Sequence, residues 1–163
     1  MSAATMLVIN RSPSNFNLVA VGWQVYPKMY DDDKTHLFIA WGDPTTKDWH
    51  ISINGKEIGY YPASLFSNMT YVDQVMWGGK TINPRNTPSP PMGYGILPDG
   101  VLGHACYFKN LAFVNEFQKS QALTKDMGAT VSTNRECYGA SYHNGEIGLT
   151  LQFGGPGGGN CIA

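Results

Sequence analysis

The sequence predicts an all-β protein, an antiparallel β-sandwich, and three observations support this class. The 163 residues include 19 glycines and 10 prolines, which break helices and permit tight turns. Tyrosine and tryptophan occur 9 and 4 times, and both favour strands. The apolar segments are short and closely spaced, without long stretches of helical period. We expect one domain over residues 18–163, preceded by an N-terminal edge segment over residues 1–17.

The charge and hydropathy patterns exclude two classes of partner. A formal net charge of −1, with 14% charged residues, provides no basic surface for nucleic acid. No run of eighteen apolar residues occurs, so we expect no membrane partner. Residues 1–10 lack the basic start of a signal peptide, and Asn10 and Arg11 interrupt their apolar stretch. Taken as given, the chain is expected to stay inside the cell.

Two strands are predicted near the N-terminus, over residues 18–26 and 35–41. Both segments are rich in β-branched and aromatic side chains. Pro27 ends the first strand, and residues 42–44 (Gly-Asp-Pro) end the second. The acidic run at 31–34 between them is interpreted as a solvated turn in preference to a metal site.

The clearest local prediction is a hairpin of residues 49–53 and 56–61. Its first arm alternates large apolar with polar side chains, the period of a half-buried strand. Asn54 and Gly55 between the arms suit a tight turn that needs positive φ angles. Pro62 then favours a short helix through Phe66, because its missing N–H is not required at a first helical position.

The C-terminal half is predicted to contain further strands separated by irregular segments. The proline-rich residues 83–95 predict a long surface loop, and residues 118–128 are polar and left unassigned. The glycine run 154–159 is expected to be flexible or tightly turned and unable to pack a core. The predicted strands are 72–77, 106–114, 136–142 and 146–153, and the last two form a hairpin around Asn144-Gly145.

No metal or cofactor site is predicted. The four histidines, His36, His50, His104 and His143, do not have the close spacing of zinc ligands, and no Cys-x-x-Cys occurs. A Ser-His-Asp triad stays possible, although the Gly-x-Ser-x-Gly signature is missing. The glycine run 154–159 lacks the Lys-Ser/Thr of a phosphate-binding loop.

Three kinds of residue keep alternative interpretations. The tryptophans, Trp23, Trp41, Trp49 and Trp77, serve either core packing or an aromatic groove for a proline-rich or sugar ligand. Cys137 and Cys161 enclose a loop of 25 residues, counted inclusively. They are free thiols in a reducing cytosol, or a disulfide contributing roughly 3–4 kcal/mol in an oxidising compartment. Asn10 and Asn68 begin glycosylation sequons, which matter only in a secreted protein.

Three aromatic blocks punctuated by glycine, at residues 21–27, 58–66 and 75–79, resemble the catalytic domain of the neprosin family. These are plant glutamic peptidases that cut at proline. Similar pieces lie at 37–41, 92–95, 105–111 and 154–158. The resemblance implies secretion, a pro-segment, and a proline-containing peptide as ligand. It also implies a β-sandwich whose concave sheet holds a substrate groove, here with Trp23, Gln24, Tyr26 and Trp77.

The catalytic pair of the family is predicted to be missing. A glutamic peptidase needs one ionised carboxylate to activate water and one neutral carboxyl to protonate the leaving amide. The resemblance places these glutamates at Ala20, two residues before Gly22, and at Lys80, directly after Trp-Gly-Gly. Losing such groups costs on the order of 10⁴–10⁶-fold in rate, so we expect little or no peptidase activity. Four other acids stay possible substitutes, and no spacing selects one: Glu57, Asp73, Glu136 and Glu146.

The chain also departs from the family in length. The family carries several dozen residues, including a cysteine pair, between the strand matched by 37–41 and the Asp-Pro matched by 43–44. We therefore expect an incomplete sandwich with unpaired strand edges, which favour aggregation. Three hypotheses stay open: a non-catalytic binding module, a peptidase with an unidentified carboxylate, and a truncated product without an independent fold.

Overall fold

A computed structural model describes residues 1–11, 16–34, 36–42, 48–53, 56–66, 69, 72–115, 117, 119–132 and 134–161. The chain divides into two compact units. Unit 1 comprises Met1–Thr5, Trp23–His36 and Trp77–Ala163, and unit 2 comprises Met6–Gly22 and Leu37–Met76. Strands dominate both units, and the helical segments are short, which confirms the predicted all-β class.

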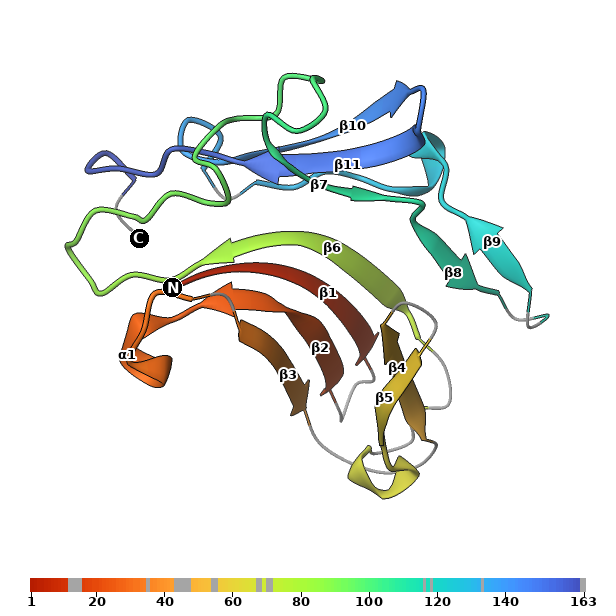
Figure 1. Cartoon of the computed structure of the whole chain (residues 1–163). Coiled ribbons are helices and arrows are strands. Elements are labelled where there is room, and N and C mark those ends of the chain that lie inside the picture. Colours follow the sequence, from red (N-terminus) through yellow and green to blue (C-terminus); the bar gives the residue numbers. More distant parts are fainter. Residues whose placement is uncertain are drawn as a thin grey trace. The chain divides into compact units, whose positions relative to one another are not determined.

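The strands form four sheets (Figure 1). One has four strands in the order β3-β2-β1-β6, and another has three in the order β10-β11-β7. The pairs β4-β5 and β8-β9 form two-stranded sheets. The strands are β1 (Ser2–Arg11), β2 (Phe16–Val25), β3 (His36–Gly42), β4 (Trp49–Ile53), β5 (Lys56–Tyr61), β6 (Gln74–Thr81), β7 (Cys106–Lys109), β8 (Ala112–Val114), β9 (Ser120–Ala122), β10 (Gly139–Gly145) and β11 (Gly148–Gly154).

The predicted hairpin of residues 49–53 and 56–61 matches β4 and β5, which pair antiparallel from Trp49↔Tyr61 to Ile53↔Lys56. Its Asn54-Gly55 turn lies outside the described residues. The short helix expected after Pro62 is the 3₁₀ turn η1 (Ala63–Leu65). Here the alternating pattern and the proline identify the elements because both act over a few neighbouring residues.

The N-terminal residues 1–17, expected as an edge segment, supply β1, which lies between β2 and β6 in the sheet order. Ala3, Thr5 and Ile9 are buried at alternate positions of this strand. Small and polar side chains such as Ala3 and Thr5 carry little hydrophobic contrast, so the strand period is weak in the sequence.

The expected strand over 106–114 is divided into β7 and β8. Asn110, between them, has a φ of 55°, a left-handed backbone that asparagine tolerates better than most residues. β9 follows and pairs with β8 from Ala112↔Ala122 to Val114↔Ser120. A second 3₁₀ turn, η2 (Lys125–Met127), lies in the polar segment that was left unassigned.

The predicted turn of the second hairpin is wrong by two residues. β10 and β11 pair from Gly139↔Gly154 to Gly145↔Gly148, so that Glu146 and Ile147 form the turn instead of Asn144 and Gly145. This register places the buried side chains of Leu151 and Phe153 on one face of the sheet. β11 is buried on both faces from Thr150 to Phe153 and also pairs with β7, so its tertiary contacts outweigh the turn preference of Asn-Gly.

Each unit has its own apolar interior. In unit 2, Val19, Tyr61, Phe66 and Met69 are buried together, and the Tyr61 and Phe66 rings meet edge to face at 6.2 Å. In unit 1, Phe108 and Phe153 stack with their centroids 5.2 Å apart. No helix in the described part of the chain is long and apolar enough to cross a membrane.

The expectation that the glycine run 154–159 cannot pack a core is wrong. Gly154 and Gly155 are buried. Gly155 and Gly158 form isolated β-bridges with Met92 and Ser89. Without a Cβ, these residues allow two backbones to approach closely.

We predict that Phe66→Ala lowers the free energy of unfolding by about 3–5 kcal/mol, because it leaves a cavity around a side chain with 0% exposure. Phe117→Ala is the matched control, since 72% of that ring is exposed, and should change stability by about 0.5 kcal/mol or less. Urea unfolding followed by circular dichroism measures both. Equal losses would contradict the assignment of the unit 2 core.

Candidate functional site

The two positions matched to catalytic glutamates differ in environment. Ala20 lies in β2, in unit 2, with 4% of its surface exposed. Lys80 lies in β6, in unit 1, and is exposed. A methyl group neither binds nor releases a proton, and an ammonium group has only donors to offer. Neither side chain supplies the carboxylate of a glutamic peptidase.

The four predicted groove residues, Trp23, Gln24, Tyr26 and Trp77, all lie in unit 1. Trp23 is 50% exposed, whereas its neighbour Gln24 is 7% exposed. Successive side chains of a strand point to opposite faces, so Trp23 and Gln24 face opposite sides of β2. Tyr26 and Trp77 are half-buried. Of the four, Trp23 offers the most ring surface to a ligand.

Gln24 has a structural partner that the sequence analysis did not single out. Its Nε2 donates a hydrogen bond of 2.8 Å to the Tyr30 hydroxyl. Tyr30 ends the short helix α1 (Pro27–Tyr30), which directly follows Tyr26. The Tyr26 carbonyl accepts hydrogen bonds from the amides of Met29 (2.9 Å) and Tyr30 (3.1 Å). The buried amide of Gln24 thus holds the helical turn that adjoins Trp23 and Tyr26.

Pro27 was the only sequence signal for this turn. A proline suits the first helical position, because the amide it lacks has no partner there. Asp31, with a φ of 57°, ends the turn in the left-handed region. The predicted end of the strand at Pro27 agrees with the structure, in which β2 ends at Val25.

The Trp-Gly-Gly segment of β6 contains two glycines in different surroundings. A Cβ built on Gly79 would lie 2.8 Å from Phe153 Cδ2 and 2.9 Å from Met92 Cγ. A Cβ on Gly78 would meet no atom within 4 Å. β6 therefore packs on β11 at Gly79, inside unit 1, with no space for a side chain. The second glycine of the motif has a packing role beside Lys80.

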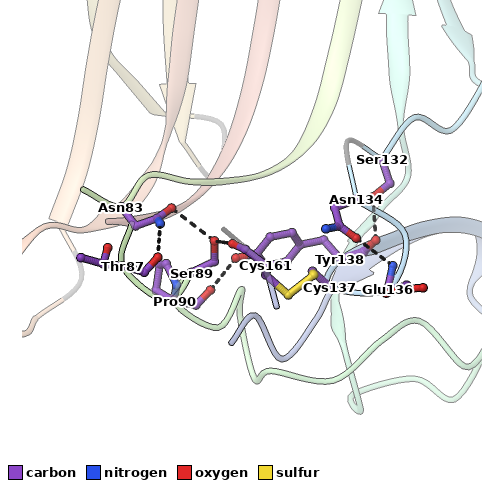
Figure 2. Close-up of a disulfide and its surroundings, with 10 residues drawn as sticks. All are labelled: Asn83, Thr87, Ser89, Pro90, Ser132, Asn134, Glu136, Cys137, Tyr138 and Cys161. Atoms are coloured by element: carbon purple, nitrogen blue, oxygen red, sulfur yellow. Dashed lines mark hydrogen bonds between the residues drawn. A yellow bond between two sulfur atoms is a disulfide. The ribbon is translucent and has the colours of Figure 1, made fainter. Parts of the chain in front are cut away.

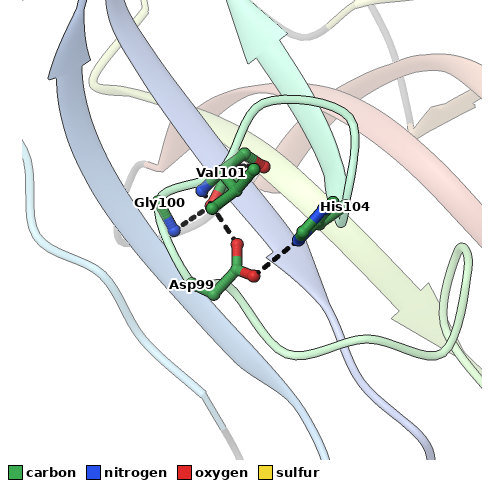
Figure 3. A network of polar contacts seen from close by, with 5 residues as sticks. Asp99, Gly100, Val101 and His104 are labelled. Atoms are coloured by element: carbon green, nitrogen blue, oxygen red, sulfur yellow. Dashed lines mark hydrogen bonds and ion pairs between the residues drawn. The ribbon is translucent and has the colours of Figure 1, made fainter.

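Asp99, Gly100, Val101 and His104 form a polar network (Figure 3), which the buried side chain of Gln152 joins. Gln152 Oε1 accepts the Gly100 amide at 2.9 Å, and its Nε2 donates to the Val101 carbonyl at 2.8 Å. Asp99 Oδ1 accepts the Val101 amide at 2.8 Å, and Asp99 Oδ2 lies 2.8 Å from His104 Nδ1. These hydrogen bonds, from His104 first and then Val101, hold the pKa of the Asp99 carboxyl below its ordinary value.

Ser141 and His143 form a second polar pair, through a hydrogen bond between Ser141 Oγ and His143 Nε2. His143 borders a cavity of about 240 Å³ with Gly100, Asn144 and Glu146. In the described part of the chain, no carboxylate is hydrogen-bonded to His143, and Asp99 is paired with His104 instead. The pair therefore lacks the orienting acid of a Ser-His-Asp triad.

Among the alternative acids whose side chains the structure describes, no hydrogen bond joins two carboxyl groups. Asp73 Oδ2 accepts the Arg11 amide, while its own amide donates to the Ile9 carbonyl at 3.0 Å. Glu136 and Glu146 are exposed, and the side chain of Glu57 lies outside the described set. Among the described residues, no group of three or more His, Cys, Asp or Glu could hold a metal ion.

Cys137 and Cys161 form a disulfide, with Cα atoms 5.8 Å apart (Figure 2). Cys106 is a half-buried free thiol. Asn10 is buried, and its Oδ1 lies 3.5 Å from Asn17 Nδ2, so its amide offers little access for glycosylation. The other glycosylation candidate, Asn68, lies outside the described residues.

The tryptophans also differ in their environments. Trp49 packs against the core of unit 2, which agrees with the packing interpretation. The side chain of Trp41 lies outside the described set. Among the three tryptophans whose side chains are described, Trp23 is the exposed one, so the groove interpretation depends mainly on it.

A comparison with protein-family models matches the family described as Neprosin over residues 1–43 and 41–156. The matched parts cover most of the chain. The two matched ranges overlap at residues 41–43, where the sequence passes from residues 37–41 almost directly to Asp43-Pro44.

We predict that Gly79→Ala destabilises the protein by about 1–3 kcal/mol, because the added methyl must displace Phe153 and Met92. Gly78→Ala is the matched control in the same motif and should change stability by less than about 0.5 kcal/mol, since space is open there. Thermal unfolding compares the two. A larger loss for Gly78→Ala would contradict the packing of β6 on β11.

We predict that His104→Ala raises the pKa of Asp99 toward its ordinary value, because the largest cause of its depression is the His104 hydrogen bond, which alanine cannot replace. A depressed folded-state pKa stabilises the fold above the unfolded-state pKa, and this contribution is lost as pH falls through the folded value. Carboxyl ¹³C NMR titration measures the shift. An unchanged Asp99 midpoint in the variant would refute the pairing.

Proposed function

We propose that this chain, which belongs to the neprosin family, binds proline-containing peptides and cleaves them weakly or not at all. The observation that carries the proposal is the pair of residues at the catalytic positions, a buried Ala20 and an exposed Lys80. The family resemblance supports the ligand class, and these side chains argue against the reaction.

The chemistry requires two carboxyl groups in opposite protonation states. Two close carboxyls reach them because the first negative charge raises the pKa of the second. With Ala20 and Lys80 in their places, no such coupling exists between these positions. A lysine ammonium neither accepts a proton from water nor forms the neutral acid of a carboxyl pair. Attack by water on a peptide bond then lacks its base.

Binding does not need the same groups. Proline-rich segments dock on exposed aromatic rings, since their extended helix is already ordered before binding. Trp23 is half-exposed and lies next to the turn of α1. Gln24 faces the other side of β2 and holds Tyr30, so we assign it a positioning role. Tyr26 and Trp77 complete the proposed groove as half-buried aromatic side chains.

Secretion is part of this proposal. The Cys137–Cys161 disulfide supports it, because disulfides persist in oxidising compartments and are rare in the cytosol. The family resemblance points the same way. A proline-rich wall or secreted protein is the kind of ligand that such a location offers.

We predict that Trp23→Ala weakens binding of a proline-rich peptide at least about tenfold, because an anchoring ring of this kind contributes about 2 kcal/mol. Tyr94→Ala is the control, since Tyr94 is an aromatic residue in the proline-rich loop of unit 1 that is even more exposed, at 74% against 50% for Trp23. Isothermal titration calorimetry measures both variants. Binding that is insensitive to Trp23, or no binding by the folded chain, would overturn the peptide-binding proposal.

We predict that the natural chain leaves the peptide intact at acidic pH, whereas the double variant Ala20→Glu, Lys80→Glu yields products. Mass spectrometry identifies the cleavage sites. Lys80→Glu alone is the matched control, because it restores one carboxyl without placing a charge at the buried position 20. Equal cleavage by the natural chain and the double variant would show that another carboxylate acts. Intact peptide in every folded sample would limit the proposal to binding.

A further inference from the structure

The C-terminal tail, residues 154–161, is anchored by one covalent bond at its far end. Cys137 stands in a turn in which the Asn134 carbonyl accepts the amides of Cys137 (3.3 Å) and Tyr138 (2.9 Å). The Tyr138 carbonyl in turn accepts the Ser132 hydroxyl at 2.6 Å (Figure 2). The disulfide thus joins a hydrogen-bonded turn to the end of the tail.

The tail pairs with the proline-rich loop, residues 83–95. Ser89 and Gly158 exchange backbone hydrogen bonds of 3.1 and 2.9 Å, and the Met92 amide donates to the Gly155 carbonyl at 2.9 Å. The Ser89 hydroxyl donates to the Cys161 carbonyl. Tyr138 Oη donates to the Pro90 carbonyl at 2.8 Å, which ties the disulfide turn to the same loop.

These contacts are nearly all between backbones. Five of the six residues 154–159 are glycines, which have no side chain to bury and gain the most conformational freedom when released. In the tail, Pro156 and Asn160 are exposed, while Cys161 is buried. Among the described tail residues, Cys161 is the one whose side chain is both buried and covalently bonded to another part of the chain. The order of the tail therefore depends on that bond.

The loop also reaches the strand that carries the proposed groove. Met92, buried in this loop, lies against the position that a Cβ of Gly79 would occupy. In the sequence of β6, Gly79 follows Trp77 and Gly78 and directly precedes Lys80. A path of contacts thus runs from Cys161 through the disulfide to Cys137, whose carbonyl lies against Gly155, and from Gly155 through Met92 to the Trp-Gly-Gly segment of β6. All of these residues belong to unit 1.

We propose that the Cys137–Cys161 disulfide is a redox switch that locks the tail onto the proline-rich loop and thereby orders the Trp-Gly-Gly segment. A dithiol reductant opens the switch by thiol–disulfide exchange, in which its thiolate attacks one sulfur and forms a mixed disulfide. The second reductant thiol then displaces the protein thiol. Cys137 and Cys161 gain two electrons and two protons in total, and the reductant leaves as its disulfide. The inference goes beyond peptide binding and does not depend on it.

Hydrogen exchange, read residue by residue by NMR, tests the switch in the full chain. The variant Cys106→Ser is the background for every sample, so that only Cys137 and Cys161 respond to the dithiol. On reduction, the amides of Ser89, Met92 and Gly158 should exchange at least about tenfold faster, because their hydrogen bonds open locally. The Met92 methyl resonance should shift as its contact with Gly79 loosens.

The amides of Asn115 and Leu123 are the internal control. They donate to the carbonyls of Lys119 and Leu111, at 3.0 and 2.8 Å, in and beside the β8-β9 hairpin. Their exchange should change by less than about twofold on reduction. Reoxidation should restore the slow exchange of the tail and loop. The double variant Cys137→Ser, Cys161→Ser should reproduce the reduced state without reagent.

Two results would overturn the switch. Unchanged exchange at Ser89, Met92 and Gly158 would show that the backbone contacts hold the tail without the disulfide. Equal acceleration at the control amides would show that the disulfide stabilises the whole unit and is no local lock. Ser89→Ala separates the contributions, since it removes the hydroxyl contact with Cys161 and keeps the disulfide. If the double cysteine variant fails to fold, chemical reduction of the Cys106→Ser chain decides between the outcomes.

Discussion

The close approach of β6 to β11 at Gly79 is the constraint on which unit 1 depends. Phe153 and Met92 occupy the space that any side chain at position 79 would need. Phe153 also stacks on Phe108, and Met92 pairs with Gly155 of the tail. β6, β11, the proline-rich loop and the C-terminal tail are therefore linked through contacts at or next to Gly79, which has no Cβ. Packing of this density transmits small displacements, because interiors have little free volume to absorb them.

The residues at the two positions that the family resemblance matches to catalytic glutamates are compatible with the packing around them. Gly79 faces inward and is fixed by its neighbours, whereas Lys80 is the next residue and is exposed. Changing an exposed side chain on a strand alters charge and chemistry with little effect on packing. At Ala20 the small side chain is buried, and a methyl group there avoids the cost that a buried carboxylate would carry. At both positions, the chemical group that the side chain presents can therefore differ without a large cost in the stability of the fold.

Local signals in the sequence identify the elements that local forces decide. The alternating residues of β4, and the proline that precedes η1, determine structure through contacts a few residues apart. The turn of the β10-β11 hairpin lies two residues later than the sequence predicts, because β11 is buried on both faces and also pairs with β7, and these tertiary contacts outweigh the turn preference of Asn-Gly. Nothing in the glycine run indicates a partner, since Ser89 lies some seventy residues away in the chain. Tertiary contacts decide such pairings, and the local structural propensities of the residues do not predict them.

The motifs that identify the family are largely the motifs that build the fold. Tyr61 and Phe66, from one aromatic block, form part of the unit 2 core, and Gly79, from another, is the close contact of unit 1. Gln24, from the third, holds the turn of α1. Packing therefore preserves these motifs independently of any reaction, because their side chains and glycines are needed to build the fold. For this chain, family membership supports the scaffold, whereas the ligand class and the weak or absent cleavage are proposals, the second of which rests on Ala20 and Lys80.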